Sequence, residues 1–136
     1  VVNDFRQNHP NRDFSIRVPD TAVNILADKF LIREALSNLL HNAVDFTEKS
    51  GRIDISISDN DDMIEFEVLD DGQGIPDYAG NRVFEKFYSL PRPDTGRKSS
   101  GLGLSIVKEI AAQHGGSAEI SNRQEQGVRA AFTVRK

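Results

Sequence analysis

Three polar side chains recur at a helical interval in a segment that otherwise reads as a buried helix. Asn38, Asn42 and Asp45 occupy positions i, i+4 and i+7 of the run FLIREALSNLLHNAVDF, so they lie on one helix face while leucine, alanine and valine fill much of the rest. A solvated face is the ordinary explanation of such a strip. Asparagine is nevertheless a poorer helix former than Lys, Glu or Arg and prefers caps and turns, which indicates that the strip serves a site.

Two glycine-rich stretches are further candidates. DDGQGIPD follows a predicted strand, and SSGLGLSIV begins a predicted helix. Neither fits the phosphate loop GxxxxGK[ST], and the first does not fit the GxGxxG fingerprint. Each stretch alone also has a purely structural explanation, because DDGQG is most simply a turn and GLGL is a common tetrapeptide.

Together these stretches indicate a site for a flat, anionic ligand. Gly72 and Gly74 at a strand end would let a flat ligand approach the backbone, and Asp70 could accept a hydrogen bond from an exocyclic amine. Gly101 and Gly103 would leave free backbone N–H groups at a helix start, where the helix dipole also favours an anion. The asparagine strip could then face the same anion through a metal ion.

Four motifs in chain order resemble those of one family. NLLHNA, DDGQG, FEKFY and GLGL are similar to the N box, first glycine box, F box and second glycine box of the ATP-binding domain of sensor histidine kinases, which belongs to the GHKL superfamily and has the Bergerat fold. Asp70 follows Asn42 by 28 positions, and Gly101 follows Asp70 by 31. The resemblance covers nearly the whole chain, so residues 1–136 are expected to form a single ATP-binding domain.

The resemblance implies a function. The chain is expected to bind ATP with magnesium and to donate the γ-phosphoryl group to a histidine on a separate dimerisation domain, as the catalytic part of a two-component sensor kinase. The implied partners are that dimerisation and phosphoacceptor domain and a response regulator downstream. The resemblance also implies that this is a cytoplasmic domain of a parent protein anchored in the inner membrane.

The resemblance further implies the residues that bind ATP and magnesium. They are Asn38, Asn42, Asp45, Phe46, Asp70, Gly72, Gly74, Ile75, Tyr88, Arg97, Lys98, Ser100, Gly101, Leu102, Gly103 and Leu104. Within this set Asn42 would bind magnesium through its side-chain oxygen, and Asn38 would lie against the phosphates. Asp70 would accept from the adenine amine, between apolar walls formed by Phe46 and Ile75.

The remaining members of the set line the base or the phosphates. Gly72 and Gly74 would line the base, and Tyr88 would pack near it. Residues 101–104 would cradle the phosphates, and residues 89–100 would form the ATP lid.

Two departures from the family pattern concern the charge around the triphosphate. Asp45 and Ser89 stand where most members carry a lysine and a basic residue, so two expected cations are absent. A carboxylate that faces phosphate is unfavourable unless a metal or a base pairs with it. Arg92, Arg97 and Lys98 of the lid are candidates to compensate, although they could equally be solvated loop charges. Weak or magnesium-dependent affinity for nucleotide is therefore expected.

The elements that must position these residues predict an α+β fold. We expect a two-layer sandwich with a mixed sheet of about five strands and helices on one face. The predicted helices are a short one at the N-terminus that HPN ends, one capped by Asp28 that runs to about Phe46, NRVFEKFY, and GLSIVKEIAAQH stopped by Gly115 and Gly116. The predicted strands are FSIRV, VNI, GRIDISISD and MIEFEVLD joined by a tight turn, SAEIS and VRAAFTV.

Composition agrees with this class of protein. The chain has 136 residues, a net charge of −4 and no cysteine, so neither nucleic-acid binding nor a disulfide framework is expected. No apolar run approaches a membrane span, and VVNDFRQNHP does not fit a signal peptide. The isolated domain is expected to be a monomer that makes no contact with the membrane.

Two other functions remain open. ATPases of the broader superfamily activate water with a glutamate four residues before the magnesium asparagine, but here Asn38 holds that position and cannot take a proton. A nucleotide-binding regulatory module without catalysis, a pseudokinase, would also explain Asp45 and Ser89. None of the three histidines resembles the family's phosphoacceptor. His41 is expected at the surface, His114 at a helix end and His9 in a loop.

Overall fold

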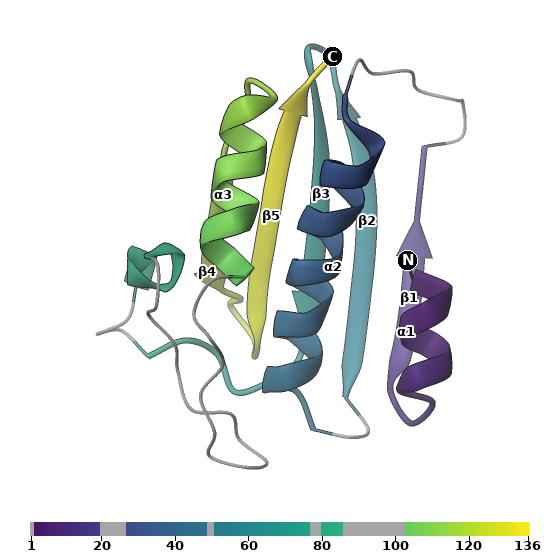
Figure 1. Cartoon of the computed structure of the whole chain (residues 1–136). Coiled ribbons are helices and arrows are strands. Elements are labelled where there is room, and N and C mark those ends of the chain that lie inside the picture. The colour runs from purple at the N-terminus through teal and green to yellow at the C-terminus, as the bar shows by residue number, and fades with distance from the viewer. Residues whose placement is uncertain (1, 20–26, 49–50, 77–79, 86–102) are drawn as a thin grey trace.

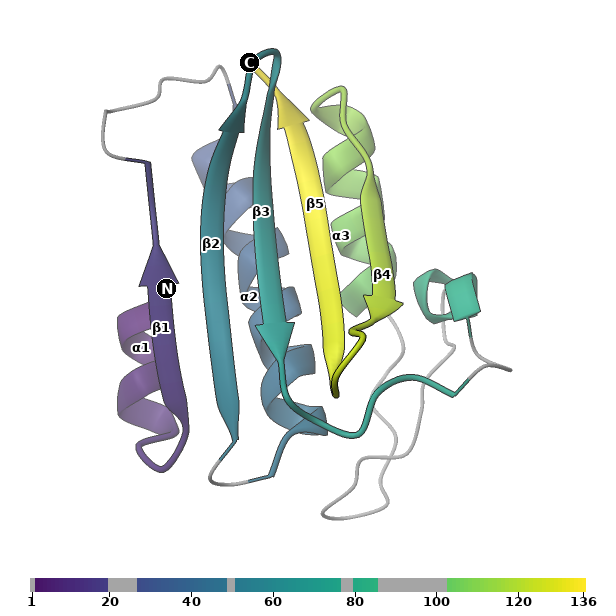
Figure 2. The same ribbon diagram turned by 180° about the vertical axis from the view of Figure 1, so that it is seen from behind.

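The centre of the molecule is a five-stranded mixed sheet (Figures 1 and 2). The computed structural model describes residues 2–19, 27–48, 51–76, 80–85 and 103–136. The strands are β1 (Asp13–Arg17), β2 (Arg52–Asn60), β3 (Met63–Asp70), β4 (Ala118–Asn122) and β5 (Val128–Arg135), in the order β1-β2-β3-β5-β4. β1 pairs parallel with β2, and the other neighbours are antiparallel. The predicted fold class is confirmed; the VNI strand lies outside the described residues.

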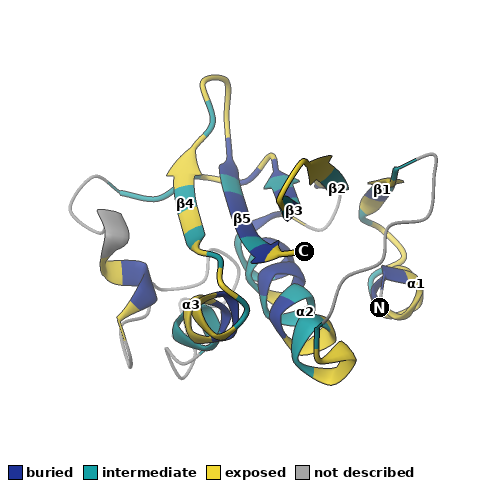
Figure 3. Ribbon diagram, turned by 90° about the horizontal axis from the view of Figure 1, so that it is seen from above, coloured by how far each residue is buried: buried dark blue, intermediate teal, exposed yellow. Residues whose placement is uncertain are grey.

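Three α-helices cover one face of this sheet, as the view from above shows (Figure 3). They are α1 (Val2–Asn8), α2 (Lys29–Phe46) and α3 (Gly103–Gln113). The stretch predicted as the helix NRVFEKFY begins as a short 3-10 helix, η1 (Gly80–Phe84), and its last three residues lie outside the described part. The sheet therefore has one apolar face under helices and one polar face.

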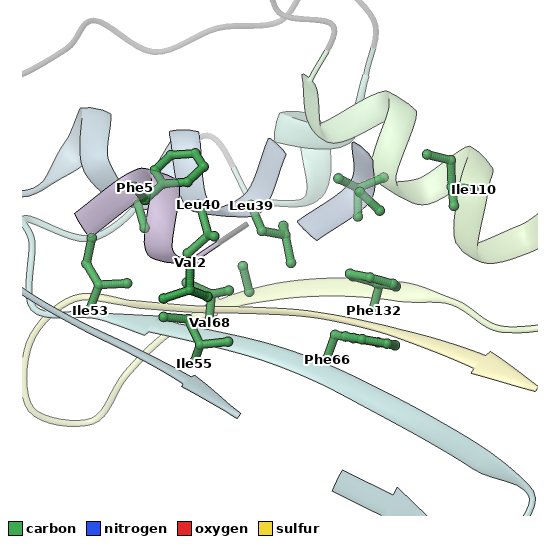
Figure 4. Packing of buried hydrophobic residues seen from close by; sticks show 14 of the residues in the cluster. Val2, Phe5, Leu39, Leu40, Ile53, Ile55, Phe66, Val68, Ile110 and Phe132 are labelled. Atoms are coloured by element: carbon green, nitrogen blue, oxygen red, sulfur yellow. The ribbon is translucent and has the colours of Figure 1, made fainter. Parts of the chain in front are cut away.

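The alternation of apolar residues explains which face of the sheet is buried. Ile53 and Ile55 of β2 and Val68 of β3 point toward the helices. There they form one buried cluster with Leu39 and Leu40 of α2 (Figure 4). On the neighbouring strands the rings of Phe66 and Phe132 stack with their centroids 4.7 Å apart. Side chains that alternate along a strand reach opposite faces, so this pattern gives a continuous core between sheet and helices.

The helix α2 has defined ends. The Asp28 side chain accepts hydrogen bonds from the N–H groups of Phe30 (2.9 Å) and Leu31 (3.2 Å), which confirms the predicted N-cap. At the other end Arg12 donates to the carbonyl oxygens of Val44 (2.9 Å) and Thr47 (3.0 Å). A side chain distant in sequence thus satisfies carbonyl groups that a helix end leaves open.

Two predicted turns are also confirmed. The β2–β3 hairpin turns through Asp61, whose φ is 57°, a value that aspartate tolerates better than most residues. α3 ends before Gly115, whose φ is 73°, and a Cβ on Gly116 would lie 1.9 Å from the carbonyl oxygen of Thr133. Glycine is therefore required where α3 turns back into β4.

Candidate functional site

The chemically distinctive residues meet at one end of the sheet. The carboxyl end of β3, the C-terminus of α2, the N-terminus of α3 and the β4–β5 hairpin lie together at the lower end of the molecule (Figures 1 and 2). The N box is on α2, the first glycine box follows β3, and the described part of the second glycine box begins α3. The fold thus brings three of the four motifs to one place.

Asp70 is a buried carboxylate at the end of β3. Its side chain is 3% exposed, and Oδ1 accepts hydrogen bonds from the N–H groups of Gly72 (2.9 Å) and Val128 (3.2 Å). Burial raises the pKa of Asp70 to about 6, although both N–H groups favour the ionised form. At neutral pH the group is therefore mostly ionised and can accept hydrogen bonds only.

Residues 70–76 comprise the end of β3 and the segment that follows it, which bends at Gly72; they are here called the glycine-box turn. A Cβ on Gly72 would lie 2.2 Å from the carbonyl oxygen of Phe46, the last residue of α2. Gly74 has a φ of +85°, and a Cβ there would lie 2.9 Å from Oδ1 of Asn122. Each glycine is thus required by contact with the protein itself, in addition to any access that it gives to a ligand.

Two residues of the β4–β5 hairpin hold this turn, and the sequence analysis did not single them out. Asn122 Oδ1 accepts from the Ile75 N–H (2.6 Å), and its Nδ2 donates to the Ile75 carbonyl (2.8 Å). Arg123 donates from Nη1 to the carbonyl oxygen of Asp70 (3.0 Å). An Asn-Arg pair after a strand is not a distinctive signal, so local pattern could not have identified them.

The asparagine strip contains a buried donor without a partner. Asn38 Nδ2 is buried and finds no hydrogen-bond acceptor in the part of the chain that the structure describes. A Cβ built on Gly103, the first residue of α3, would lie 3.7 Å from Asn38 Oδ1, so Asn38 and the start of α3 are neighbours. A buried orphan N–H is uncommon in a native protein and suits a bound acceptor such as a phosphate oxygen.

The other two members of the strip are half-buried on α2. Asn42 lies one turn beyond Asn38, and Asp45 lies toward the end of the helix. Asp45 also interacts with His9, and its charge favours protonation of that ring. The pKa of His9 is nevertheless lowered, mainly by burial and then by Arg12.

A small apolar cluster supports the site on the side of η1. Val83 and Phe84 are buried, and Ile75 and Leu104 pack against them. Phe84 is therefore a packing residue. This cluster links the glycine-box turn to the first turn of α3.

Two of the histidines, His41 and His114, contact residues outside the proposed site. His41 is exposed and its ring meets Phe5 edge-on at 4.7 Å, and His114 accepts from the Asp28 N–H through Nε2 at 3.2 Å. Both positions agree with the sequence analysis. In the described ranges no group of three His, Cys, Asp or Glu side chains could hold a metal ion, and no helix there is long and apolar enough to cross a membrane.

Six of the implied site residues cannot be placed, because they lie outside the described residues, as does the lid at 89–100. They are Tyr88, Arg97, Lys98, Ser100, Gly101 and Leu102. The structure places the other members of the set at or beside the same end of the sheet.

Comparison with known proteins gives one family and a consistent set of relatives. The model of the family described as histidine kinase-, DNA gyrase B- and HSP90-like ATPase matches residues 27–136. The sensor protein CreC of Escherichia coli (strain K12) is 46% identical over 125 residues, which cover 92% of this chain and 26% of CreC. The sensor protein KdpD of Clostridium acetobutylicum is 32% identical, with 93% of this chain and 14% of KdpD covered. The chain thus spans about a quarter or less of these relatives.

Solved structures show the same fold. The catalytic domain of the histidine kinase ThkA superposes with a TM-score of 0.84 at 29% identity, covering 98% of this chain and 86% of that one. ThkA in complex with the response regulator protein TrrA gives 0.79 at 28% identity, with 98% and 36% covered. Full-length ShkA in complex with AMPPNP gives 0.78 at 29% identity, with 98% and 28% covered.

Proposed function

Because the chain belongs to the family of histidine kinase-, DNA gyrase B- and HSP90-like ATPases, we propose that it binds ATP with magnesium and donates the γ-phosphoryl group to a histidine on a separate dimerisation domain. Residues 1–136 then form a single ATP-binding catalytic domain, with residues 89–100 as its lid. The observation that carries the proposal is that the same end of the sheet holds the buried acceptor Asp70 and a buried donor, Asn38 Nδ2, that has no partner among the described residues. The two groups suit opposite ends of a nucleotide.

Asp70 reads the base in this proposal. Among the described residues, both N–H groups that donate to the Asp70 side chain bind Oδ1, so Oδ2 is the atom that would accept from the exocyclic amine of adenine. Guanine presents a carbonyl oxygen at the same ring position, which an ionised carboxylate would repel. Phe46 and Ile75 supply apolar walls, Gly72 and Gly74 line the base, and Tyr88 packs near it.

The phosphates lie between α2 and the start of α3. Asn38 Nδ2 donates to a phosphate oxygen, and the N–H groups and dipole of α3 face the same anion. The backbone of residues 101–104 and the side chains of Arg97, Lys98 and Ser100 complete the cradle.

The donor set fits magnesium. Asn42 offers an amide oxygen, a ligand that suits a hard cation, and phosphate oxygens and water would fill the other positions, as they usually do for magnesium bound with ATP. The metal supplies neutralisation of charge on the phosphates. The residues of the chain hold and orient the nucleotide, which is the protein's main contribution in phosphoryl transfer.

Two structural neighbours support the choice of partners. One structure of ThkA is a complex with a response regulator, and ShkA was solved with AMPPNP. We infer that the chain acts with the dimerisation and phosphoacceptor domain of its own kinase and with a downstream response regulator. It would do so as a cytoplasmic domain of a parent protein anchored in the inner membrane.

One alternative is favoured by a specific residue. Asp45 is half-buried on the same helix as Asn42 and would add negative charge near the proposed triphosphate. A regulatory module that binds nucleotide without phosphoryl transfer would tolerate that charge. A hydrolytic ATPase is disfavoured, because Asn38 cannot act as the base that activates water.

Transfer in trans separates these functions. The chain should bind ATP as a monomer, hydrolyse it negligibly and leave its own histidines unlabelled. It should label a histidine on a separately supplied dimerisation domain of the same kinase when incubated with γ-labelled ATP and magnesium. A nucleotide-binding module would bind ATP without labelling that domain, and rapid phosphate release without any partner would indicate a hydrolytic ATPase.

A further inference from the structure

We propose that Asn122 is a positioning residue of the nucleotide site, whose side-chain amide clamps Ile75 and thereby holds the glycine-box turn in the shape that receives the base. Asn122 is the last residue of β4 and lies 47 positions from Ile75 in the sequence. It belongs to none of the four motifs. The inference rests on the function proposed above and extends the site to the β4–β5 hairpin.

The clamp is a two-point contact with one residue. Oδ1 of Asn122 accepts from the Ile75 N–H at 2.6 Å, and Nδ2 donates to the Ile75 carbonyl oxygen at 2.8 Å. Two residues that exchange both hydrogen bonds form the same pattern in an antiparallel sheet. The amide therefore acts as a short additional strand, and it fixes the chain on both sides of the Ile75 Cα.

Gly74 is matched to this clamp. Its φ of +85° is a conformation that side chains rarely adopt, and a Cβ there would come within 2.9 Å of Asn122 Oδ1. The second glycine of the box thus makes room for the amide that holds its neighbour Ile75. No such contact could be inferred from the spacing of the two glycines.

The same hairpin holds the other end of the turn. Arg123 Nη1 donates to the Asp70 carbonyl oxygen at 3.0 Å, and the Val128 N–H donates to Asp70 Oδ1 at 3.2 Å. A Cβ on Gly127 would lie 1.9 Å from the Asp70 carbonyl oxygen, so hairpin and turn are in direct backbone contact. The hairpin therefore sets the position of the base-reading carboxylate relative to Ile75.

The clamp lies at the surface of the protein, and its two hydrogen bonds act on the glycine-box turn. Asn122 is an exposed residue at a strand end and is not a member of the core, to which β5 contributes Ala130, Phe132 and Val134. Loss of the amide should therefore leave the core intact and release the turn between Gly72 and Ile75. Binding would then require the nucleotide to order a turn that the wild-type protein holds ready.

Two variants and one control test the clamp. Asn122→Ala removes both hydrogen bonds, whereas Asn122→Asp keeps the acceptor but places a carboxylate oxygen against the Ile75 carbonyl. Each should weaken binding of both ATP and ADP about tenfold in calorimetry with magnesium, because the change is at the base end. Binding of GTP should weaken less, because the Asp70 carboxylate makes no favourable contact with guanine, so the preference for ATP should fall. Gln124→Ala, at an exposed residue of the same hairpin, should match wild type.

Each possible result supports or overturns the proposed role of Asn122. Wild-type affinity and wild-type preference for ATP in both Asn122 variants would overturn the clamp, as would an equal loss of ATP and GTP binding or unfolding of Asn122→Ala by circular dichroism. If Asn122→Asp alone unfolds, Asn122→Ala carries the test. Faster hydrogen exchange at the Ile75 amide in Asn122→Ala would support the clamp directly. A wild-type protein that binds no ATP would overturn the proposed function itself.

Discussion

At the scale of the residue, Asp70 lowers stability at neutral pH, and its proposed role in recognition depends on the same buried charge. A buried carboxylate is held ionised at neutral pH only because two N–H groups offset part of its desolvation. Because its pKa of about 6 in the folded protein lies above the ordinary 3.8, the folded state binds this proton more tightly than the unfolded chain does. The contribution of Asp70 to stability is therefore present below about pH 4 and is lost as the pH rises to about 6.

The variant Asp70→Asn tests whether the buried charge lowers stability while it supports recognition of the base. An amide can accept the same two hydrogen bonds without a charge, so the variant should be more stable than wild type by about 1–3 kcal/mol at pH 7.5 and by much less near pH 4. Urea unfolding at both pH values measures the difference. The same variant should lose its preference for ATP over GTP. A stability gain that is equal at both pH values would show that the pKa of Asp70 is not raised in the folded protein.

A substitution of Asn42 tests the proposed magnesium site. Asn42→Ala removes the proposed magnesium ligand from a half-buried helix position and should lower the affinity for ATP at least tenfold in the presence of magnesium. Affinity without magnesium should change little, because the amide then has no cation to bind. Calorimetry with and without EDTA measures both. Equal affinity of the variant and wild type with magnesium would remove Asn42 from the site.

At the scale of the element, α2 is positioned by residues outside it. Asp28 caps its start, and Arg12 from the segment between α1 and β1 binds the carbonyl oxygens of Val44 and Thr47 at its end. Since Gly72 packs against Phe46 at that same end, the position of the helix terminus also determines where the glycine-box turn lies.

The variant Arg12→Ala should loosen that end of α2. It leaves carbonyl groups of the helix end without their donor and should lower the free energy of unfolding by about 1–3 kcal/mol. It should also raise the pKa of His9, because the charge of Arg12 contributes to lowering that pKa. Thermal unfolding and NMR titration of the ring measure the two effects. Arg17→Ala, at an exposed residue of β1, is the matched control and should change neither.

At the scale of the whole molecule, the two faces of the sheet are held by different interactions. The helix-covered face is apolar, whereas on the other face Arg129 of β5 contacts Glu67 (2.6 Å), Glu119 (2.8 Å) and Glu65 (3.3 Å) from its two neighbouring strands. The ion pairs tie β3, β5 and β4 together, which are the strands whose ends form the site.

Nucleotide should therefore stabilise the molecule as a whole. A ligand that contacts the ends of β3, α2 and α3 binds the folded state alone, and at a hundredfold excess over its Kd it adds about 2.7 kcal/mol to the free energy of unfolding. ATP with magnesium should raise the Tm by roughly 10 °C, and GTP should raise it much less. Differential scanning fluorimetry with ATP, ADP and GTP measures the shifts. Equal shifts for ATP and GTP would contradict base recognition by Asp70.

Signals between neighbouring residues along the chain predicted most of the described strands and helix ends. Apolar residues at every second position, such as Ile53 and Ile55, predicted the buried strands. Asp28 predicted a helix cap and Gly115 predicted a helix end, because each signal acts over a few residues. The order of the four motifs indicated the family, since its functional residues recur in a fixed sequence.

The contacts of the candidate site residues became known from the tertiary structure, because they join distant parts of the chain. Gly72 meets the end of α2, and Ile75 meets Asn122 across 47 positions of sequence, so the contacts that require these residue types are not local. The raised pKa of Asp70 depends on burial by several elements at once. Long-range packing sets such properties, and no pattern within a short stretch records which distant side chain will supply a hydrogen bond.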